Sequence, residues 1–423
     1  MNSNSMTYQA YVQILKEELL PAMGCTEPIA IAYCAAKARD VLGEIPDSIE
    51  VEASGNIIKN VKSVVVPNTE GRKGLEAAAA IGVLGGEADK GYEVIASVRP
   101  ETKMKLGAYL ATTPIKVLPA DSDHVLDVSV LVRKGEHHAL VRAVNEHTNI
   151  VRIEKDAQVL LDRHPSESRE DERRALLNIH DIYDFAKTAQ LDDVRDVLSQ
   201  QIRYNSAISA EGLRGDYGAN IGKVLLDMDG NNVRVRAKAM AAAGSDARMN
   251  GCEMPVVINS GSGNQGITTS VPVVVYAKEL GVSEEKRYRA LILSNLTTIH
   301  VKTPIGRLSA YCGAVGAGAG AGAGIAYLCG GGFKEIAHTV VNSLAIVSGI
   351  VCDGAKASCA AKIASAVEAG ILGYNMYIRG QQFYGGDGIV TKGVEETLQN
   401  VGRLGKEGMK ETNEEIIKIM IGE

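Results

Sequence analysis

Two patterns of hydrophobic and polar positions alternate over the first 165 residues. Apolar residues at helical spacing predict helices over residues 6–20, 28–42, 74–84 and 101–112. Short β-branched runs bounded by turn residues predict strands, and these runs are SIEVEAS, VKSVVVP, YEVIASV, IKVLPA, VLDVSVLV, HALVRAVN and TNIVRIE. The mixture predicts an N-terminal mixed α/β domain over residues 1–165 with a mostly antiparallel sheet.

The pattern changes in the segment LDRHPSESREDERRALLNIHD, where a proline and a dense run of both charges interrupt the apolar positions. Such a run is typical of a solvated connection or an exposed helix, so we place the domain boundary there. Beyond it the strand pattern nearly vanishes, and apolar residues recur at helical spacing. We therefore predict an all-α helical domain over residues 180–423, and an α+β fold class for the whole chain.

The stretch AYCGAVGAGAGAGAGIAYLCGGG, residues 310–332, has glycine at every second position from 316 to 324. A flexible linker would carry serine and other polar residues. A nucleotide-binding loop would need a preceding strand or a terminal Gly-Lys-Ser/Thr. Five glycines in a helix cost roughly 4–5 kcal/mol relative to alanine, which packing must recover. We therefore predict a buried helix whose neighbours approach its backbone closely.

Composition and charge exclude several classes of partner. The net charge of −6 and the charged fraction of 23% lack the basic excess that nucleic acids or anionic membranes require. The first 20 residues lack the features of a secretory signal. The longest apolar stretch, residues 338–352, is too short and too polar to span a bilayer. We expect a cytoplasmic protein that binds a small molecule, not nucleic acid or a membrane, with a homodimer as an option for its assembly.

Seven cysteines, an odd number, are expected to be reduced thiols used for packing, metal binding or catalysis. Cys25, in PAMGCTEPIA, precedes a predicted helix whose N-terminal dipole would stabilise a thiolate; a small buried cysteine in a turn is the structural alternative. Cys312 precedes the Gly-Ala helix, and Cys352 lies at the end of another apolar helix. Cys34 and Cys329 lie within apolar helical patterns and are predicted to be core residues. The patterns assign no role to Cys252 and Cys359.

The segment NSGSGNQGI, residues 259–267, is dense in glycine and small polar side chains and precedes a predicted helix. Its backbone N–H groups and the helix N-terminus can form a site for an anion such as a carboxylate. The structural alternative is a capped polar turn.

Several motifs in the same order along nearly the whole chain resemble the L-cysteine desulfidase family, which is related to the iron-sulfur L-serine dehydratase alpha chain. These motifs are GCTEPIA, KN at Lys59 and Asn60, HTNIVRIE, SDARM, NSGSGNQGIT, RLSAYC and CDGAKASCA. The resemblance implies a 4Fe-4S cluster held by Cys25, Cys312 and Cys352, and conversion of L-cysteine to pyruvate, ammonia and sulfide. It also implies an active site between a mixed α/β domain and a helical domain.

The implied chemistry suits these residue types. Three thiolates leave one iron of the cluster open, and an open iron is a Lewis acid for the substrate sulfur. A base must remove the α-proton, and the candidates are Lys59, His147 and Glu27. The residues expected to bind the substrate are Asn56, Arg248, Asn259, Ser260, Ser262, Asn264 and Gln265.

Three other functions remain open at this point. L-serine is the nearest alternative substrate for the same cluster chemistry. A pyridoxal phosphate lyase could use Lys59 for its Schiff base. A non-catalytic amino-acid or redox sensor could bind Zn²⁺ through its cysteines or oxidise them, although the sequence has no CxxC or Cys/His pair.

Overall fold

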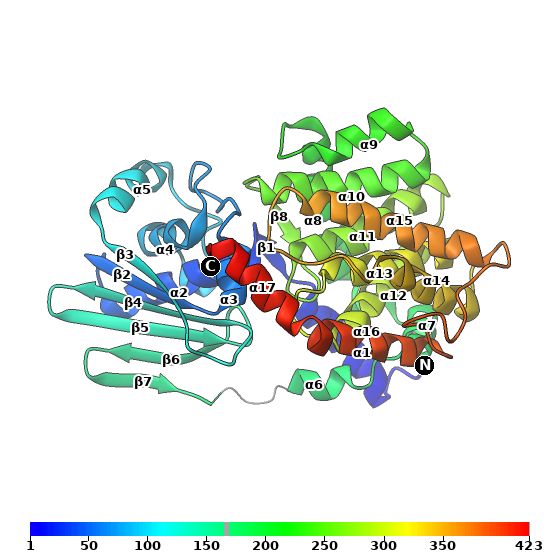
Figure 1. Ribbon diagram of the computed structural model, residues 1–423, viewed down its shortest axis with the longest axis horizontal. Coiled ribbons are helices and arrows are strands. Elements are labelled where there is room, and N and C mark those ends of the chain that lie inside the picture. The colour runs from blue at the N-terminus through cyan, green and yellow to red at the C-terminus, as the bar shows by residue number, and fades with distance from the viewer. Residues whose placement is uncertain (165–168, 423) are drawn as a thin grey trace.

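A six-stranded sheet with its helices lies beside a larger helical region in the computed structural model, which describes residues 1–164 and 169–422 (Figure 1). The predicted α+β class is confirmed. The helix that ends the described chain, α17 (Lys410–Ile421), runs from the helical region back to the α/β region and contacts α3 (Gly55–Val61) there. Within the described ranges, no helix is both long enough and apolar enough to cross a membrane.

The sheet has the strand order β3-β2-β4-β5-β6-β7, and every pairing is antiparallel except that of β2 with β3. Its strands are β2 (Ser48–Ala53), β3 (Ile115–Pro119), β4 (Asp127–Lys134), β5 (His137–Val144), β6 (Ile150–Lys155) and β7 (Gln158–Asp162). Along β4, the alternate residues Val128, Val130 and Val132 are fully buried, as expected for a strand with one face on the core. The mostly antiparallel sheet is therefore confirmed.

Small residues bring the helices of this region very close together. The helices are α2 (Thr26–Leu42), α3, α4 (Gly74–Gly85), the 3₁₀ helix η1 (Ala88–Glu93) and α5 (Pro100–Thr112). Helix α2 packs on β4 and β5 and against α4. A Cβ atom at Gly82 of α4 would lie 2.5 Å from the carbonyl oxygen of Ala32 in α2, so only glycine permits this approach.

Two of the predicted strands are wrong. The run at residues 61–67 is the last turn of α3 followed by turns, and its only strand-like feature in the described chain is an isolated bridge between Val65 and Lys73. The run at residues 92–98 belongs to the end of η1 and to turns. Val64 and Ile95 in these runs are fully buried. Their β-branched pattern thus reflects burial in irregular backbone and not an extended strand.

The helical region begins with α1 (Met6–Glu18), although that helix precedes the sheet in the sequence. Tyr8 and Tyr11 of α1 meet the ring of Phe185 at centroid distances of 5.0 and 5.4 Å, within the helical core. The short strands β1 (Pro21–Met23) and β8 (Pro255–Val257) pair antiparallel. The division at residues 165 and 180 stays a prediction, and residues 165–168 of the predicted connection lie outside the described residues.

The remaining helices follow this connection. They are α6 (Arg169–Arg174), α7 (Ile179–Thr188), η2 (Leu191–Asp193), α8 (Arg195–Arg214), α9 (Ile221–Asp229), α10 (Val233–Met249), α11 (Gly263–Glu279), α12 (Glu284–Lys302), α13 (Gly313–Leu328), α14 (Phe333–Val347), α15 (Cys359–Tyr377), α16 (Val394–Arg403) and the π-helical turn η3 (Leu404–Gly408).

The Gly-Ala stretch is the buried helix α13, as predicted. It packs against α11, α12, α14 and α15. A Cβ atom at Gly320 would lie 2.1 Å from Thr298 Oγ1 and 2.6 Å from the Ser294 carbonyl oxygen of α12. The glycines are therefore needed for close helix packing. Cys34 is buried as predicted, but the prediction for Cys329 is wrong: it caps the C-terminus of α13, where the helix meets solvent, and is exposed.

Candidate active site

A short antiparallel backbone bridge holds two of the predicted cysteine ligands together. The amide N–H of Cys312 donates to the Ile350 carbonyl oxygen at 3.1 Å, and the amide N–H of Cys352 donates to the Ala310 carbonyl oxygen at 2.6 Å. Cys352 lies in the loop between α14 and α15, five residues beyond the end of the apolar helix. Backbone pairing of two distant loops therefore fixes the positions of both thiols.

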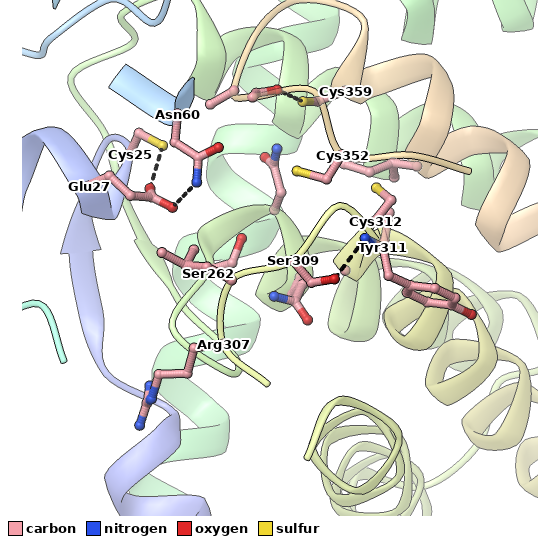
Figure 2. Close-up of a pocket in the computed structure, with 18 of the residues that line it drawn as sticks. Cys25, Glu27, Asn60, Ser262, Arg307, Ser309, Tyr311, Cys312, Cys352 and Cys359 are labelled. Carbon is pink, nitrogen blue, oxygen red and sulfur yellow. Dashed lines mark hydrogen bonds between the residues drawn. The ribbon is translucent and has the colours of Figure 1, made fainter. Parts of the chain in front are cut away.

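These two thiols line a cavity of about 100 Å³ together with Cys25 and Cys359 (Figure 2). The three predicted ligands thus meet at one cavity, and a fourth cysteine joins them. Cys312 interacts electrostatically with Cys352 and Cys359. Cys25 interacts most with Glu27 and Arg248 and also with Cys359, which packs against the apolar cluster that contains Cys25. The cavity therefore has two ends, one with three cysteines and one with Cys25 and Glu27.

Four helices begin at this cavity. Cys25 is the N-cap residue of α2, Ser262 that of α11 and Cys312 that of α13, while Cys359 is the first residue of α15. Helix N-termini present unpaired N–H groups and a partial positive charge. The cavity consequently favours anionic groups such as thiolates and carboxylates.

A hydrogen-bonded group of buried side chains forms the Cys25 end. The Cys25 thiol donates to Glu27 Oε2 at 3.1 Å, and Asn60 Nδ2 donates to Glu27 Oε1 at 2.9 Å (Figure 2). Burial, together with the negative charge of Glu27, raises the pKa of the Cys25 thiol well above its usual value. In this arrangement Cys25 is a protonated donor to the Glu27 carboxylate.

Glu27 is the ionised member of this group. Burial alone would raise its pKa, but the nearby His147 and the hydrogen bond from Cys25 lower it on balance. Burial also lowers the pKa of His147 to about 4, so this ring is neutral near pH 7. With His147 neutral, the hydrogen bond from the Cys25 thiol and the positive charge of Arg248 favour the ionised form of Glu27.

Several buried polar atoms around the cavity lack a hydrogen-bond partner among the described residues. Arg248 is only 2% exposed, yet its Nε and Nη2 atoms are unpaired. The same is true of Asn60 Oδ1, Asn264 Oδ1 and Gln265 Oε1. Buried polar groups are normally paired, so this concentration of unpaired atoms indicates a site that a polar ligand completes.

The structure brings four of the seven expected substrate-binding residues to the cavity, namely Arg248, Ser262, Asn264 and Gln265. Asn259 and Ser260 do not line it. Asn259 Nδ2 donates to Asn295 Oδ1 at 2.9 Å, and Ser260 Oγ donates to Asn259 Oδ1 at 2.9 Å, so both stabilise the loop that precedes α11. Asn56 lines a neighbouring cavity of about 550 Å³ beneath α17.

Of the three predicted bases, only Glu27 lines the cavity. Lys59 is buried with its Nζ bonded to Asn413 Oδ1 at 2.6 Å and to the Cys352 carbonyl oxygen at 3.3 Å. This geometry makes Lys59 a support for the Cys352 loop and argues against a Schiff-base lysine. His147 lies behind the cavity, close to Gly261.

Among the lining residues that sequence reasoning did not assign to the site are Cys359, Asn60 and Lys302. Cys359 and Asn60 belong to the motifs CDGAKASCA and KN that carry the resemblance, but a single sequence does not show which residue of a motif faces a ligand. Lys302, the last residue of α12, carries no local signal apart from being a cation at a helix C-terminus.

The thiol set fits an iron-sulfur cluster. Within the described ranges, no three His, Cys, Asp or Glu side chains are grouped closely enough to hold a single metal ion. A 4Fe-4S cluster takes one thiolate per iron, so its ligands surround a body of several atoms. Four thiols around a cavity, together with unpaired polar atoms beside them, suit such a group and a polar substrate.

Comparisons with known proteins identify the family of the chain. The serine dehydratase alpha chain family matches residues 89–418. A UPF0597 protein of Desulfitobacterium hafniense is 58% identical over 428 residues, which cover 100% of this chain and 99% of the relative. Those of Lachnoclostridium phytofermentans and Treponema denticola are 53% and 47% identical, cover 98% and 100% of this chain, and are each matched over 100% of their length. The names of these relatives specify no substrate.

Proposed function

Because this chain belongs to the UPF0597 family and carries a serine dehydratase alpha chain domain, we propose that it is an iron-sulfur-dependent ammonia-lyase acting on a small amino acid. Enzymes of the serine dehydratase alpha chain family use such a cluster. The observation that carries the proposal is one cavity that combines four cysteines, an ionised carboxylate and a guanidinium with two unpaired nitrogen atoms.

We assign the cluster to Cys312, Cys352 and Cys359. The resemblance implies Cys25 in place of Cys359, but the Cys25 thiol is hydrogen-bonded to Glu27 and lies at the other end of the cavity. When bound, the cluster supplies a Lewis-acidic iron to the substituent on the substrate β-carbon.

The other end of the cavity orients the substrate and handles its proton. The Arg248 guanidinium, with two unpaired N–H groups, is suited to hold the α-carboxylate in a bidentate pair. Glu27 is the base for the α-proton, since it is ionised, faces the cavity and is oriented by Asn60. Cys25, which donates to Glu27, is placed to pass a proton to or from that carboxylate.

L-cysteine is the substrate that we propose within this class. Loss of the α-proton and of the β-sulfur as hydrogen sulfide gives aminoacrylate, and hydrolysis of aminoacrylate yields pyruvate and ammonia. A soft thiolate is a good ligand for iron. L-serine is the second candidate, and the match to the serine dehydratase alpha chain family supports it.

The test is an assay of protein purified and reconstituted without oxygen. Pyruvate is measured with L-cysteine and with L-serine, and sulfide is measured with L-cysteine. We expect several iron and acid-labile sulfide atoms per chain, and a higher kcat/KM for L-cysteine. A higher kcat/KM for L-serine would make the protein a serine dehydratase. Full cluster loading without pyruvate from either amino acid would overturn the proposal of a lyase.

A further inference from the structure

Lys302 is a buried cation to which neither the resemblance nor the proposed reaction gives a role. It ends α12, is only 7% exposed, and lines the cavity that holds the four cysteines. No carboxylate of the described chain forms an ion pair with its ammonium group. The adjacent basic side chains Arg307 and Lys59 differ in this respect, because Arg307 pairs with Glu18 and Lys59 is bonded to Asn413.

The ionisable groups that interact most with Lys302 are two thiols. Cys352 and Cys312 both favour its charged form, whereas Lys59 and Arg307 disfavour it. Burial nevertheless lowers the pKa of the Lys302 ammonium to about 8. A buried cation without an anionic partner destabilises a protein, and the C-terminal dipole of α12 offsets only part of that cost. An anion bound in the cavity that Lys302 lines would offset the rest of that cost.

We propose that the Lys302 ammonium is the counter-cation of the Cys312 and Cys352 thiolates when these hold the cluster. The inference rests on the proposed function and adds a residue that stabilises the bound cluster. In its usual oxidised state, a four-iron core with three thiolates carries a net negative charge, which is costly to bury. A positive charge that interacts with two of the thiolates lowers that cost. Lys302 is therefore a positioning and charge-balancing residue and not a ligand.

This role predicts opposite effects on the two forms of the protein. Lys302→Met keeps the length of the side chain and removes its charge, and Lys302→Arg keeps the charge. In apo-protein, the methionine variant should unfold at the same temperature as the wild type or higher, because an unpaired buried charge is gone. In reconstituted protein, it should lose its cluster to an iron chelator about tenfold faster, the effect of one lost charge-assisted interaction.

The experiment compares the wild type, both Lys302 variants and Lys278→Met after anaerobic reconstitution. Lys278 is exposed at the far end of α11, so its replacement changes the net charge equally without touching the cavity. The readouts are iron and sulfide per chain, the rate at which cluster absorbance is lost to chelator, and the thermal midpoint of apo-protein. We expect Lys302→Arg and Lys278→Met to behave like the wild type.

The possible failures are distinguishable. If the wild type takes up no cluster, both the proposed function and this inference are overturned. If the wild type takes up a cluster and Lys302→Met holds it equally well, only the inference fails. A lower midpoint of apo Lys302→Met, with faster cluster loss also in Lys302→Arg, would show that the side chain acts through packing and would overturn the charge-balancing role.

Discussion

Replacement of Arg248 by methionine tests the substrate-binding end of the cavity most directly. Arg248 lies in the last turn of α10, is 2% exposed, and leaves Nε and Nη2 without partners in the described structure. A Cβ atom at Gly263 would lie 2.3 Å from Arg248 Nε, so the first residue of α11 must be glycine to admit the guanidinium. Arg248→Met removes the charge and both donors but preserves much of the apolar stem.

The expected loss follows from the two unpaired donors. A hydrogen bond to a charged group contributes about 1.5–3 kcal/mol, so the loss of a bidentate contact to a carboxylate removes roughly 3–6 kcal/mol. Converted to rate, kcat/KM should fall by about two to four orders of magnitude. Apo-protein should not lose stability, because the variant also removes a buried charge that has no partner.

The assay is pyruvate formation without oxygen over a range of L-cysteine concentrations, with iron measured in every preparation. Arg248→Lys is the matched control, since it keeps the charge but not the planar fork, and we expect intermediate activity. Iron content should equal that of the wild type in both variants. If kcat/KM of Arg248→Met stays within about threefold of the wild type at equal iron content, Arg248 does not bind the carboxylate.

Three further predictions address the cluster, the packing and the pH dependence. Cys359→Ser should lose most of its cluster iron, whereas Cys25→Ser should keep its iron and lose turnover; the reverse result would restore the ligand set implied by the resemblance. Gly320→Ala should lower the free energy of unfolding in urea by about 1–3 kcal/mol through overpacking against the α12 backbone. Gly316→Ala is the control and should change that free energy far less, because its new Cβ atom would meet only a side chain, at 3.0 Å. Burial lowers the pKa of His147 to about 4 from 6.5. The contribution of the neutral His147 ring to the free energy of unfolding is therefore fully present above pH 6.5 and is lost as the pH falls toward 4. His147→Gln should therefore reduce the loss of stability between pH 6.5 and pH 4 by up to about 3 kcal/mol. If the free energy of unfolding depends on pH in the same way in the variant and the wild type, His147 is not buried as a neutral imidazole.

The fold was predictable where local pattern and tertiary environment agree. The β-branched runs at β4 and β5 predict strands, and both form as expected. The strand predictions for residues 61–67 and 92–98 were wrong because an apolar β-branched run indicates burial but not an extended conformation. These two runs are buried in irregular backbone. The Gly-Ala helix was predictable because the cost of glycine in a helix requires close neighbours. The identity of those neighbours, α12 and α15, depends on the tertiary fold.

The site was predictable in part for the same reason. Local context made Cys25, Cys312 and Cys352 candidates for chemistry, because each lies next to a helix end or a glycine, and the resemblance implied that they are ligands. Their convergence, and the presence of Cys359 beside them, depends on the pairing of loops that are 40 residues apart. Unpaired atoms such as Arg248 Nε are invisible in a sequence, since they are defined by partners that the folded chain fails to provide.

A β-elimination requires removal of an α-proton and departure of a β-substituent, and the proposed site assigns these two tasks to different ends of the cavity. Removal of an α-proton needs an ionised base, and the proposed base is Glu27, which accepts hydrogen bonds from Cys25 and Asn60. Departure of a β-substituent needs an electrophile, and the three-cysteine end is suited to hold one. A substrate whose carboxylate is held by Arg248 would lie across the space between the two ends. Four helix N-termini around that space favour the anions that both tasks involve, so the geometry fits a β-elimination better than a sensor, which would require only one of the two ends.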